Sequence, residues 1–480
     1  MMELILVLLP FAGAGLALIW RGRRTRPYLL PVVGVGHAVV TTLLLLSPAE
    51  VDAGAWISSD ALTRAVLPLV SLLFLVCGFY AVAYLRVRED RDHRIFVAAL
   101  LAMQGLLSLA LQAQHLGLLW IAAEATTLAT IPLLHFNGTA RAFEATWKYL
   151  LIGGTGIALS LLGAFCLGYA SLQGTGGGDL TFRALTGSAS TFATPWLVAA
   201  WVLLLAGFGT KMGLVPMHTW KPDAYGEAPG VVGVLLAGGV TTMAFVALLR
   251  VKQVVDAGGG TEMTQRTLLL IGLFSMVVAA LFLLGTRDFK RMLAYSSVEH
   301  MGILAVGAAA GGAGIAAALF HVWTNGLTKA SLFLAAGNLR RAAGASTVGE
   351  VAGMAWRVPV TSRLFVVGLL AITAIPPFGP FASVMSVVRA IFATGQPVSA
   401  AVFLFAMLLS FIGLTRLVFA IVDGRPRTRA RGTGPQFAEA RGILVPPLLF
   451  LLGSLWFGVA VPEPIRRQWD LAVRMLMPPS

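Results

Sequence analysis

The chain has little charge and almost no cysteine. Asp, Glu, Lys and Arg make up 12% of its 480 residues, whereas 58% are hydrophobic, a balance that excludes a soluble globular protein. The two cysteines, Cys77 and Cys166, lie within apolar runs, which excludes a disulfide framework and a cysteine-ligated metal or iron–sulfur centre. Neither GxGxxG nor a Walker phosphate loop occurs, so no motif for a nucleotide or a flavin is present. We therefore expect no metal and no cofactor on this chain.

Long apolar runs are what the sequence has in abundance. The runs are about 20 residues long, which is the length that a helix needs to cross a bilayer. They do not alternate with a period of two residues, as the strands of a membrane barrel would. The sequence therefore predicts an all-α polytopic membrane protein with about 14 transmembrane helices. The predicted spans are 2–20, 28–47, 61–85, 95–112, 115–135, 142–172, a seventh in two pieces (195–213 and 216–226), 229–250, 267–285, 293–312, 315–338, 361–395, 398–422 and 443–461.

The positive charges are concentrated in alternate loops. The net charge is +14, and the arginines gather near positions 21–26, 86–94, 287–291, 340–341 and 425–441. The predicted spans place these loops on one side of the membrane, and loops rich in Lys and Arg face the cytoplasm. We predict a multi-pass protein of the cytoplasmic (inner) membrane, with both termini on the non-cytoplasmic side. Its basic balance therefore reflects membrane topology rather than nucleic-acid binding, and the lipid bilayer is an expected partner.

Prolines interrupt two of the predicted spans. One interruption is at Pro216, and the other is at Pro376-Pro377. Proline has no N–H for the helical hydrogen-bond pattern, and broken helices at matching positions are typical of internally repeated transporters. We therefore predict two broken helices and two inverted five-helix repeats. The predicted division is 1–94 for the first three spans, 95–251 for the first repeat, 266–422 for the second repeat, and 443–480 for the last span and an amphipathic tail.

A lysine and a glutamate within the spans are the first candidate site. The chain has 6 lysines against 29 arginines, and a lysine can lose its proton when desolvated, whereas an arginine cannot. Lys211 lies beside the break at Pro216, and Glu124 lies in the middle of the fifth span. At ~4 Å and an effective dielectric of ~20, the pair would interact by about 4 kcal/mol, enough to change the protonation of Lys211. A static ion pair that joins two helices is the alternative.

The eleventh span carries the second candidate site. His321, Asn325 and Lys329 are spaced by four residues, so they share one helix face. Thr324 and Thr328 lie beside them. Such a polar stripe can pass protons through water-connected side chains. Interhelical hydrogen bonds that only hold the bundle together are the alternative.

Four further residues are candidates for proton uptake or an accessory role. Lys148 lies near a helix start, and His218 follows the break, where it either lines a cytoplasmic funnel or forms an interfacial hydrogen bond. Glu299 and His300 open the tenth span. We expect these two at the cytoplasmic boundary, where a solvated structural role is also compatible with the sequence.

Four stretches together resemble a known family over roughly residues 60–420. They are GTKMGLVPMHTWKPDAYGEAP (209–229), DFKRMLAYSSVEHMG (288–302), FHVWTNGLTKASLFLAAGNL (320–339) and AITAIPPFGPFAS (371–383). They are similar to the antiporter-type subunits of respiratory complex I, Mrp cation/proton antiporters and membrane-bound nickel–iron hydrogenases. Two further stretches, EATTLATIPLL (124–134) and EATWKYLLIGGTGIALSLLG (144–163), most resemble the F-type component of hydrogenase-4 and formate hydrogenlyase. The resemblance implies other membrane subunits and a soluble redox arm as partners, and protons, or less often sodium, as the transported ion.

The resemblance also assigns roles, which this sequence meets only in part. Glu124 matches the charge-pair glutamate of the family, Lys211 the lysine of the seventh span, Lys329 the lysine of the central axis, and His321 a family histidine. The eighth span, VVGVLLAGGVTTMAF, has no Lys or His where many relatives have a bridging residue.

Two further departures lie in the eleventh and twelfth spans. Asn325 stands where some relatives have a second histidine, and Val384 stands where relatives have a lysine or glutamate as the exit group. Valine cannot titrate. Arg389 is close enough in sequence to contribute a charge instead.

The sequence thus predicts a proton-translocating subunit of a modular respiratory or hydrogenase-type oxidoreductase complex, with the redox chemistry on partner subunits. Val384 motivates the first alternative, a structural subunit that does not pump. A Na+/H+ antiporter module is the second alternative.

Overall fold

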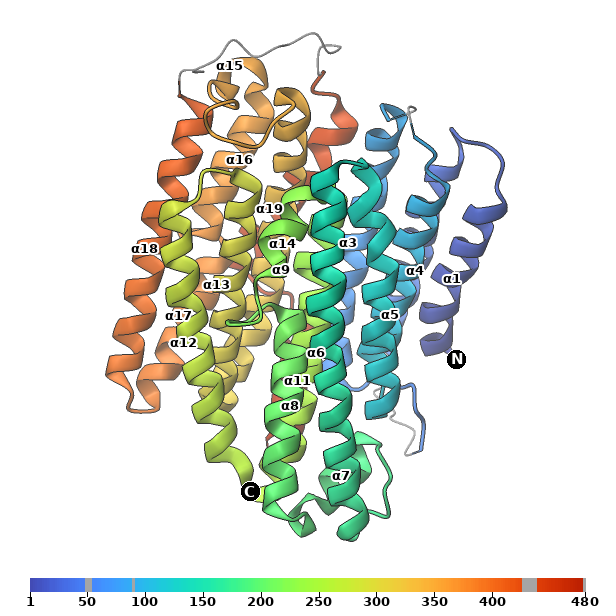
Figure 1. The fold of residues 1–480 in the computed structure, drawn as a ribbon, viewed down its shortest axis with the longest axis vertical. Coiled ribbons are helices and arrows are strands. Elements are labelled where there is room, and N and C mark those ends of the chain that lie inside the picture. Colours follow the sequence, from blue (N-terminus) through green and yellow to red (C-terminus); the bar gives the residue numbers. More distant parts are fainter. Residues whose placement is uncertain (48–53, 89–90, 425–437, 478–480) are drawn as a thin grey trace.

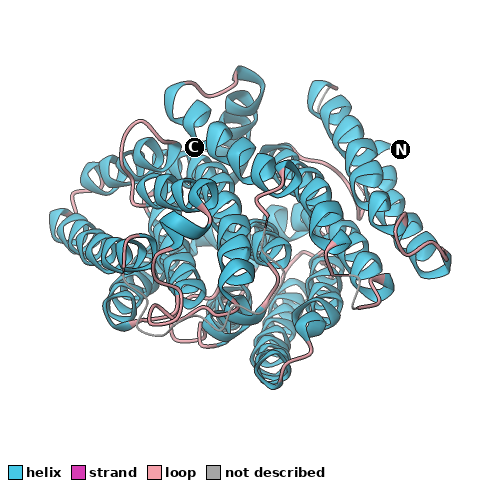
Figure 2. Cartoon of the chain, turned by 90° about the horizontal axis from the view of Figure 1, so that it is seen from above, coloured by secondary structure: helices cyan, strands magenta, loops and turns pink. Residues whose placement is uncertain are grey.

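The computed structural model describes residues 1–47, 54–88, 91–424 and 438–477 of the chain. Over these ranges the chain is almost entirely helical and forms no β-strand. Its helices run side by side in one bundle (Figure 1), which Figure 2 shows end-on. Ten helices in the described part are long and apolar enough to cross a membrane. These observations confirm an all-α, multi-pass membrane protein.

The elements differ in length. The long helices are α1 (Met2–Ile19), α2 (Leu29–Leu46), α3 (Ala61–Arg86), α4 (Arg94–Gln112), α5 (Leu116–Leu134), α6 (Ala140–Gln173), α8 (Thr194–Met212), α11 (Thr241–Val255), α12 (Thr261–Gly285), α13 (Phe289–Ala309), α14 (Gly311–Ala343), α18 (Pro397–Val422) and α19 (Arg441–Val459). The shorter helices are α7 (Phe182–Ser188), α9 (Trp220–Glu227), α10 (Gly230–Leu235), α15 (Met354–Arg357), α16 (Pro359–Ile372), α17 (Gly379–Ala393) and α20 (Glu463–Leu476).

The segment 230–285 holds two helices that meet at a kink, as the two predicted spans require. A π-helical turn, Leu236–Val240, joins α10 to α11, whereas the residues between α11 and α12, Asp256–Gly260, are not continuously helical. Gly259 there has a φ of 83°, a left-handed conformation that ends one helix before the next begins. Helical segments lie at every predicted span, while the count of fourteen, the inverted repeats and the four-part division of the chain stay predictions.

The first broken helix ends before its proline. Gly213, directly after α8, has a φ of 76°, a left-handed conformation that glycine adopts without steric cost. The N–H of Leu214 then donates to the carbonyl of Gly209 at 2.8 Å, which satisfies one of the free carbonyls at the helix end. The break therefore begins at Gly213, where the first half of the predicted span also ends, and the helix resumes at Trp220 rather than at Pro216.

The second broken helix repeats this arrangement. Ala374, just after α16, has a φ of 58°, and the N–H of Ile375 donates to the carbonyl of Leu370 at 3.1 Å. A cis proline follows at Pro377, as one does at Pro216 in the first break. The two breaks predicted from proline are thus present, with the same local backbone at each.

The interior of the bundle is centred on α14. This helix contacts α13, α16, α17 and α19 along its length, and its residues 321–336 are all buried. The amphipathic helix α20 packs Trp469 and Ala472 against α3 and α14, so its apolar face covers protein rather than lying free. The candidate residues of the eleventh span therefore lie at the centre of the molecule.

Candidate functional site

Five of the six lysines are buried. The sixth, Lys148, keeps 43% of its side chain exposed. A charged side chain within a membrane bundle costs about 2.5–3.5 kcal/mol or more, so the partners of each buried amine decide what it can do. The buried lysines are Lys211, Lys221, Lys252, Lys290 and Lys329.

The first cluster joins α5 to the end of α8. Lys211 is 1% exposed and donates a hydrogen bond to the hydroxyl of Thr127. That hydroxyl in turn donates to Oε2 of Glu124 at 3.1 Å. No direct ion pair joins Lys211 to Glu124 in the described part of the chain, and the two groups are connected through a hydroxyl instead. The cause is Thr127, which lies one turn after Glu124 on the same helix face and comes between the two charges.

The broken helix holds Lys211 in place. Lys211 lies in the last turn of α8, where the free carbonyls and the helix dipole favour a positive charge. Its amine is also 5.9 Å from the centre of the Tyr149 ring on α6, a distance at which an aromatic face attracts a cation. Three elements, α5, α6 and α8, therefore meet at this amine.

The second cluster is a chain of side chains that crosses α13, α14 and α17. Nδ1 of His300 lies 2.9 Å from Nε2 of His321. Nδ1 of His321 lies 2.9 Å from the hydroxyl of Ser383, which is 2.8 Å from the hydroxyl of Thr324. Each of these groups can both donate and accept a hydrogen bond. The chain of contacts is therefore suited to moving a proton between helices.

Glu299 and His300 lie buried in the middle of α13, so the solvated position at a span opening that the sequence indicated is wrong. Each is 1% exposed, well inside α13. The helix begins earlier than predicted because Asp288 caps it, accepting from the backbone N–H groups of Lys290 and Arg291, as N-cap aspartates do. Oε1 of Glu299 has no hydrogen-bond partner among the described residues.

The stripe on α14 divides into two parts. Lys329 is fully buried and donates to the carbonyl of Leu293 on α13 at 3.3 Å, while Oδ1 of Asn325 is buried with no partner within the described ranges. The hydroxyl of Thr328 instead contacts that of Ser454 on α19 at 2.7 Å. Thr328 and Lys329 therefore each form an interhelical hydrogen bond, Thr328 to α19 and Lys329 to α13.

After the second break, neither Val384 nor Arg389 supplies a buried charge. Val384 is 1% exposed and packs in an apolar cluster with Ile303 and Val306. Arg389 is exposed on α17, so it does not supply the missing charge to the buried chain. Ser383, directly before Val384, makes the polar contact with His321. Sequence reasoning missed Ser383, although it is the last residue of the 371–383 stretch.

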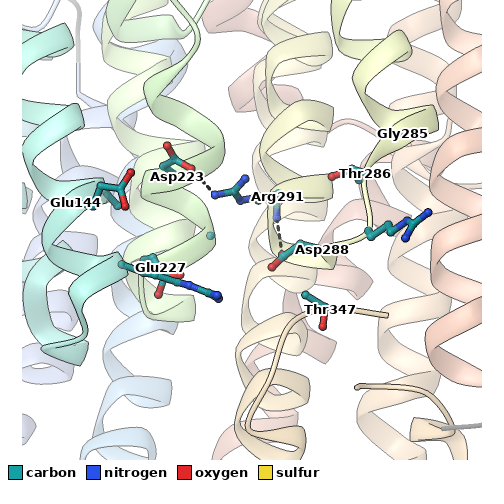
Figure 3. Close-up of a pocket in the computed structure, with 12 residues that line it drawn as sticks. Glu144, Asp223, Glu227, Gly285, Thr286, Asp288, Arg291 and Thr347 are labelled. Carbon is teal, nitrogen blue, oxygen red and sulfur yellow. Dashed lines mark hydrogen bonds and ion pairs between the residues drawn. The ribbon is translucent and has the colours of Figure 1, made fainter. Parts of the chain in front are cut away.

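A charged cavity lies beside the arginine-rich loop at 287–291. It has a volume of about 550 Å³, and Figure 3 shows Asp223 and Arg291 pointing toward one another. Asp223 accepts from Nη2 of Arg291 at 2.6 Å and from Nζ of Lys148 at 2.9 Å. Lys148 also pairs with Glu144 at 2.7 Å. Lys148 therefore belongs to a network of ion pairs near the rim of this cavity.

His218 and Lys221 are two buried residues of the segment that follows the first break, His218 just before α9 and Lys221 on it. His218 is 7% exposed, and its ring centre is 6.2 Å from that of Phe282. Lys221 is fully buried, and its amine donates to the hydroxyl of Ser297 at 3.3 Å. Sequence reasoning missed Lys221, although it is the one lysine in the polar run after the break, HTWKPDAY.

These features define a class of protein. It is a polytopic helical membrane protein with buried lysines, histidines and carboxylates beside two broken helices. Residues 113–410 match the family described as NADH:quinone oxidoreductase/Mrp antiporter, transmembrane. The chain belongs to this family, which confirms the resemblance in the four sequence stretches.

Relatives and solved structures agree with this assignment. The hydrogenase-4 component F homolog of Methylacidiphilum infernorum is 34% identical over 368 residues, covering 74% of this chain and 76% of that protein. Subunit N of an NADH-quinone oxidoreductase from Desulforudis audaxviator is 31% identical, covering 83% of this chain and 81% of that one. A chain of an archaeal membrane-bound sulfane sulfur reductase, 21% identical, has a TM-score of 0.88, covering 99% of this chain and 97% of that chain. The last likeness establishes the fold.

Proposed function

We propose that this chain translocates protons as an antiporter-like membrane subunit, with Glu124, Lys211 and Lys329 as its titrating groups. The observation that carries the proposal is the site of Lys211. Its amine is buried next to a broken helix and is linked to the carboxylate of Glu124 through one hydroxyl. An amine in such a place can gain and lose a proton, and a neighbouring carboxylate that comes closer or moves away changes which form is favoured.

The polar groups suggest an order for the proton's path. The cavity lined by Asp223, to which Lys148 is bonded, is the proposed uptake region, and His218, just before α9, is the proposed next group. His300, His321 and Ser383 continue the path from α13 to α17. Each transfer needs a hydrogen-bonded partner or one bridging water.

We further propose that the chain works in a complex. The relatives include components of a hydrogenase and of an NADH-quinone oxidoreductase, so other membrane subunits and a soluble redox arm are the proposed partners. Those subunits would hold the redox cofactors and metals, and none is assigned to this chain. The arginine-rich loops support a place in the cytoplasmic membrane with both termini on the non-cytoplasmic side.

The test uses the assembled complex. The full chain is tagged, purified with its accompanying subunits in mild detergent and reconstituted into liposomes. A potassium gradient with valinomycin then imposes a potential, and an enclosed pH-sensitive dye reports proton flux. We expect Lys211→Met to lower the flux about 100-fold, the usual scale for loss of a positioned proton carrier. Equal flux from wild type and Lys211→Met would contradict the proposal.

Lys252 provides a matched control. It is buried as Lys211 is, but it pairs with Asp256 on the same helical segment, away from the clusters described above. The double substitution Lys252→Gln with Asp256→Asn removes a buried lysine and its carboxylate together. We expect proton flux close to that of the wild type.

The alternative, a structural subunit that does not pump, is favoured by one observation. Val384 and its apolar neighbours lie next to Ser383, where the chain of polar side chains reaches α17. A wild-type complex with no more proton flux than empty liposomes would support this alternative. Flux that requires a sodium gradient would instead support the Na+/H+ antiporter module.

A further inference from the structure

Lys221 lies in the second half of the first broken helix, where the described site leaves it without a role. It is on α9, and its side chain is fully buried. The helix α9 contacts both α6 and α13. It therefore packs against the helix whose Tyr149 ring faces Lys211 and against the helix whose Leu293 carbonyl accepts from Lys329.

On the side of Lys211, the Lys221 side chain contacts the break itself. A methyl group placed on Gly213 would lie 2.4 Å from Cδ of Lys221 and 3.0 Å from its Nζ. Gly213 is the second residue after Lys211 in the chain. The Lys221 side chain is thus packed directly against the backbone that ends α8, next to the turn that carries Lys211.

On the side of Lys329, the Lys221 side chain contacts α13. The Lys221 amine donates to Ser297 at 3.3 Å. Ser297 lies four residues, or about one helical turn, after Leu293, whose carbonyl accepts from the Lys329 amine at 3.3 Å. Lys221 and Lys329 therefore reach neighbouring turns of the same helix.

Lys221 differs in its partners from three of the other lysines, and like Lys211 it contacts one hydroxyl and one aromatic ring. Lys148 and Lys252 form ion pairs with carboxylates, and Lys290 donates to two backbone carbonyls. Within the described ranges, no carboxylate lies within ion-pair distance of Lys221, and one hydroxyl and the ring of Tyr225 at 5.8 Å are its polar contacts. In this part of the chain Lys221 thus has no carboxylate with which to form a permanent structural ion pair. Because a buried charge without a counter-ion is costly, its charged form is not held in place by a partner of opposite charge.

The adjacent helical segment supplies no other titratable side chain between Lys211 and Lys329. Residues 230–249, which follow α9, contain no Lys, Arg, His, Asp or Glu. We propose that Lys221 is the proton-carrying link between Lys211 and Lys329, with Ser297 holding its amine toward α13. This inference rests on the proposed function, since a link matters only if protons pass along the path.

The test compares three lysine variants in the reconstituted complex with the imposed potential. We expect Lys221→Met to lower proton flux about 100-fold while the complex still assembles. Lys221→Arg should lower it to the same extent, because arginine keeps the charge but does not release its proton. Should Lys221→Met fail to assemble, Lys221→Gln, which retains a polar head for Ser297, is expected to give the same loss.

The outcomes separate this inference from the function on which it rests. Near-normal flux in Lys221→Arg would overturn the inference, because a positive charge alone would then suffice. Normal flux in Lys221→Met or Lys221→Gln together with loss in Lys211→Met would overturn the link and leave the function intact. Normal flux in Lys211→Met would overturn the proposed function itself.

Discussion

The coupling of Glu124 to Lys211 depends on one residue, Thr127, through its hydroxyl. It accepts from the lysine and donates to the carboxylate, so both charged groups lose a partner when it is removed. Hydrogen bonds to charged groups contribute about 1.5–3 kcal/mol. We expect Thr127→Val to lower proton flux about tenfold, which is the equivalent of about 1.4 kcal/mol, measured in the reconstituted complex.

Two other substitutions serve as controls for Thr127. Thr127→Ser restores the hydroxyl and should restore the flux. Thr126, its buried neighbour, donates only to the carbonyl of Ala123 in the same helix, so Thr126→Val should leave the flux near normal. Equal effects of the two valine substitutions would show that helix packing matters here, and not the link to Lys211.

At the scale of elements, the first break depends on the backbone of Gly213. Its left-handed conformation is unfavourable for residues with a Cβ, at about 1–3 kcal/mol. A Cβ at this position would also meet the Lys221 side chain at 2.4 Å. We expect Gly213→Ala to lower the midpoint of thermal unfolding in detergent and to reduce proton flux, since it moves the amine of Lys221.

A second glycine separates backbone strain from the effect on Lys221. Gly177 has a φ of 62° and no neighbouring heavy atom within 4 Å of an added methyl group. Gly177→Ala therefore introduces a similar strain without a clash, and it should affect stability but not flux. If Gly213→Ala leaves both the unfolding midpoint and the flux unchanged, the break is less constrained than its geometry indicates.

Some features of these elements were predictable from the sequence and others were not. The breaks at Pro216 and Pro377 were predictable because proline has a local effect on the helix. The contacts of Ser383 and Lys221 were not, since they depend on which turns of different helices meet, and helix periodicity carries no information on that. The depth of Glu299 was predictable in part, because Asp288 is a recognisable helix cap. The sequence thus specifies the helices and the lysines, and tertiary packing decides which side chains connect them.

At the scale of the whole molecule, a buried ion pair joins segments that are far apart in the chain. Arg250 on α11 donates to Oδ2 of Asp60 at 2.6 Å and to its Oδ1 at 3.1 Å. Asp60 also caps α3 by accepting from the N–H of Thr63. The pair therefore attaches the third span to the segment that follows the first break.

Removing one member of this pair should destabilise the fold and spare the proton path. Arg250→Met would leave the Asp60 carboxylate buried without its counter-ion, a loss of about 3–5 kcal/mol. The measurement is the unfolding midpoint of the detergent-solubilised chain. The double variant Arg250→Met with Asp60→Asn removes the stranded charge and retains an acceptor for the α3 cap, so its midpoint should lie above that of Arg250→Met. A single variant as stable as the wild type would mean that the pair contributes little.

Since neither residue contacts the clusters at Lys211 or His321, complexes that still assemble should keep their proton flux, which separates the attachment of the helices from the movement of protons.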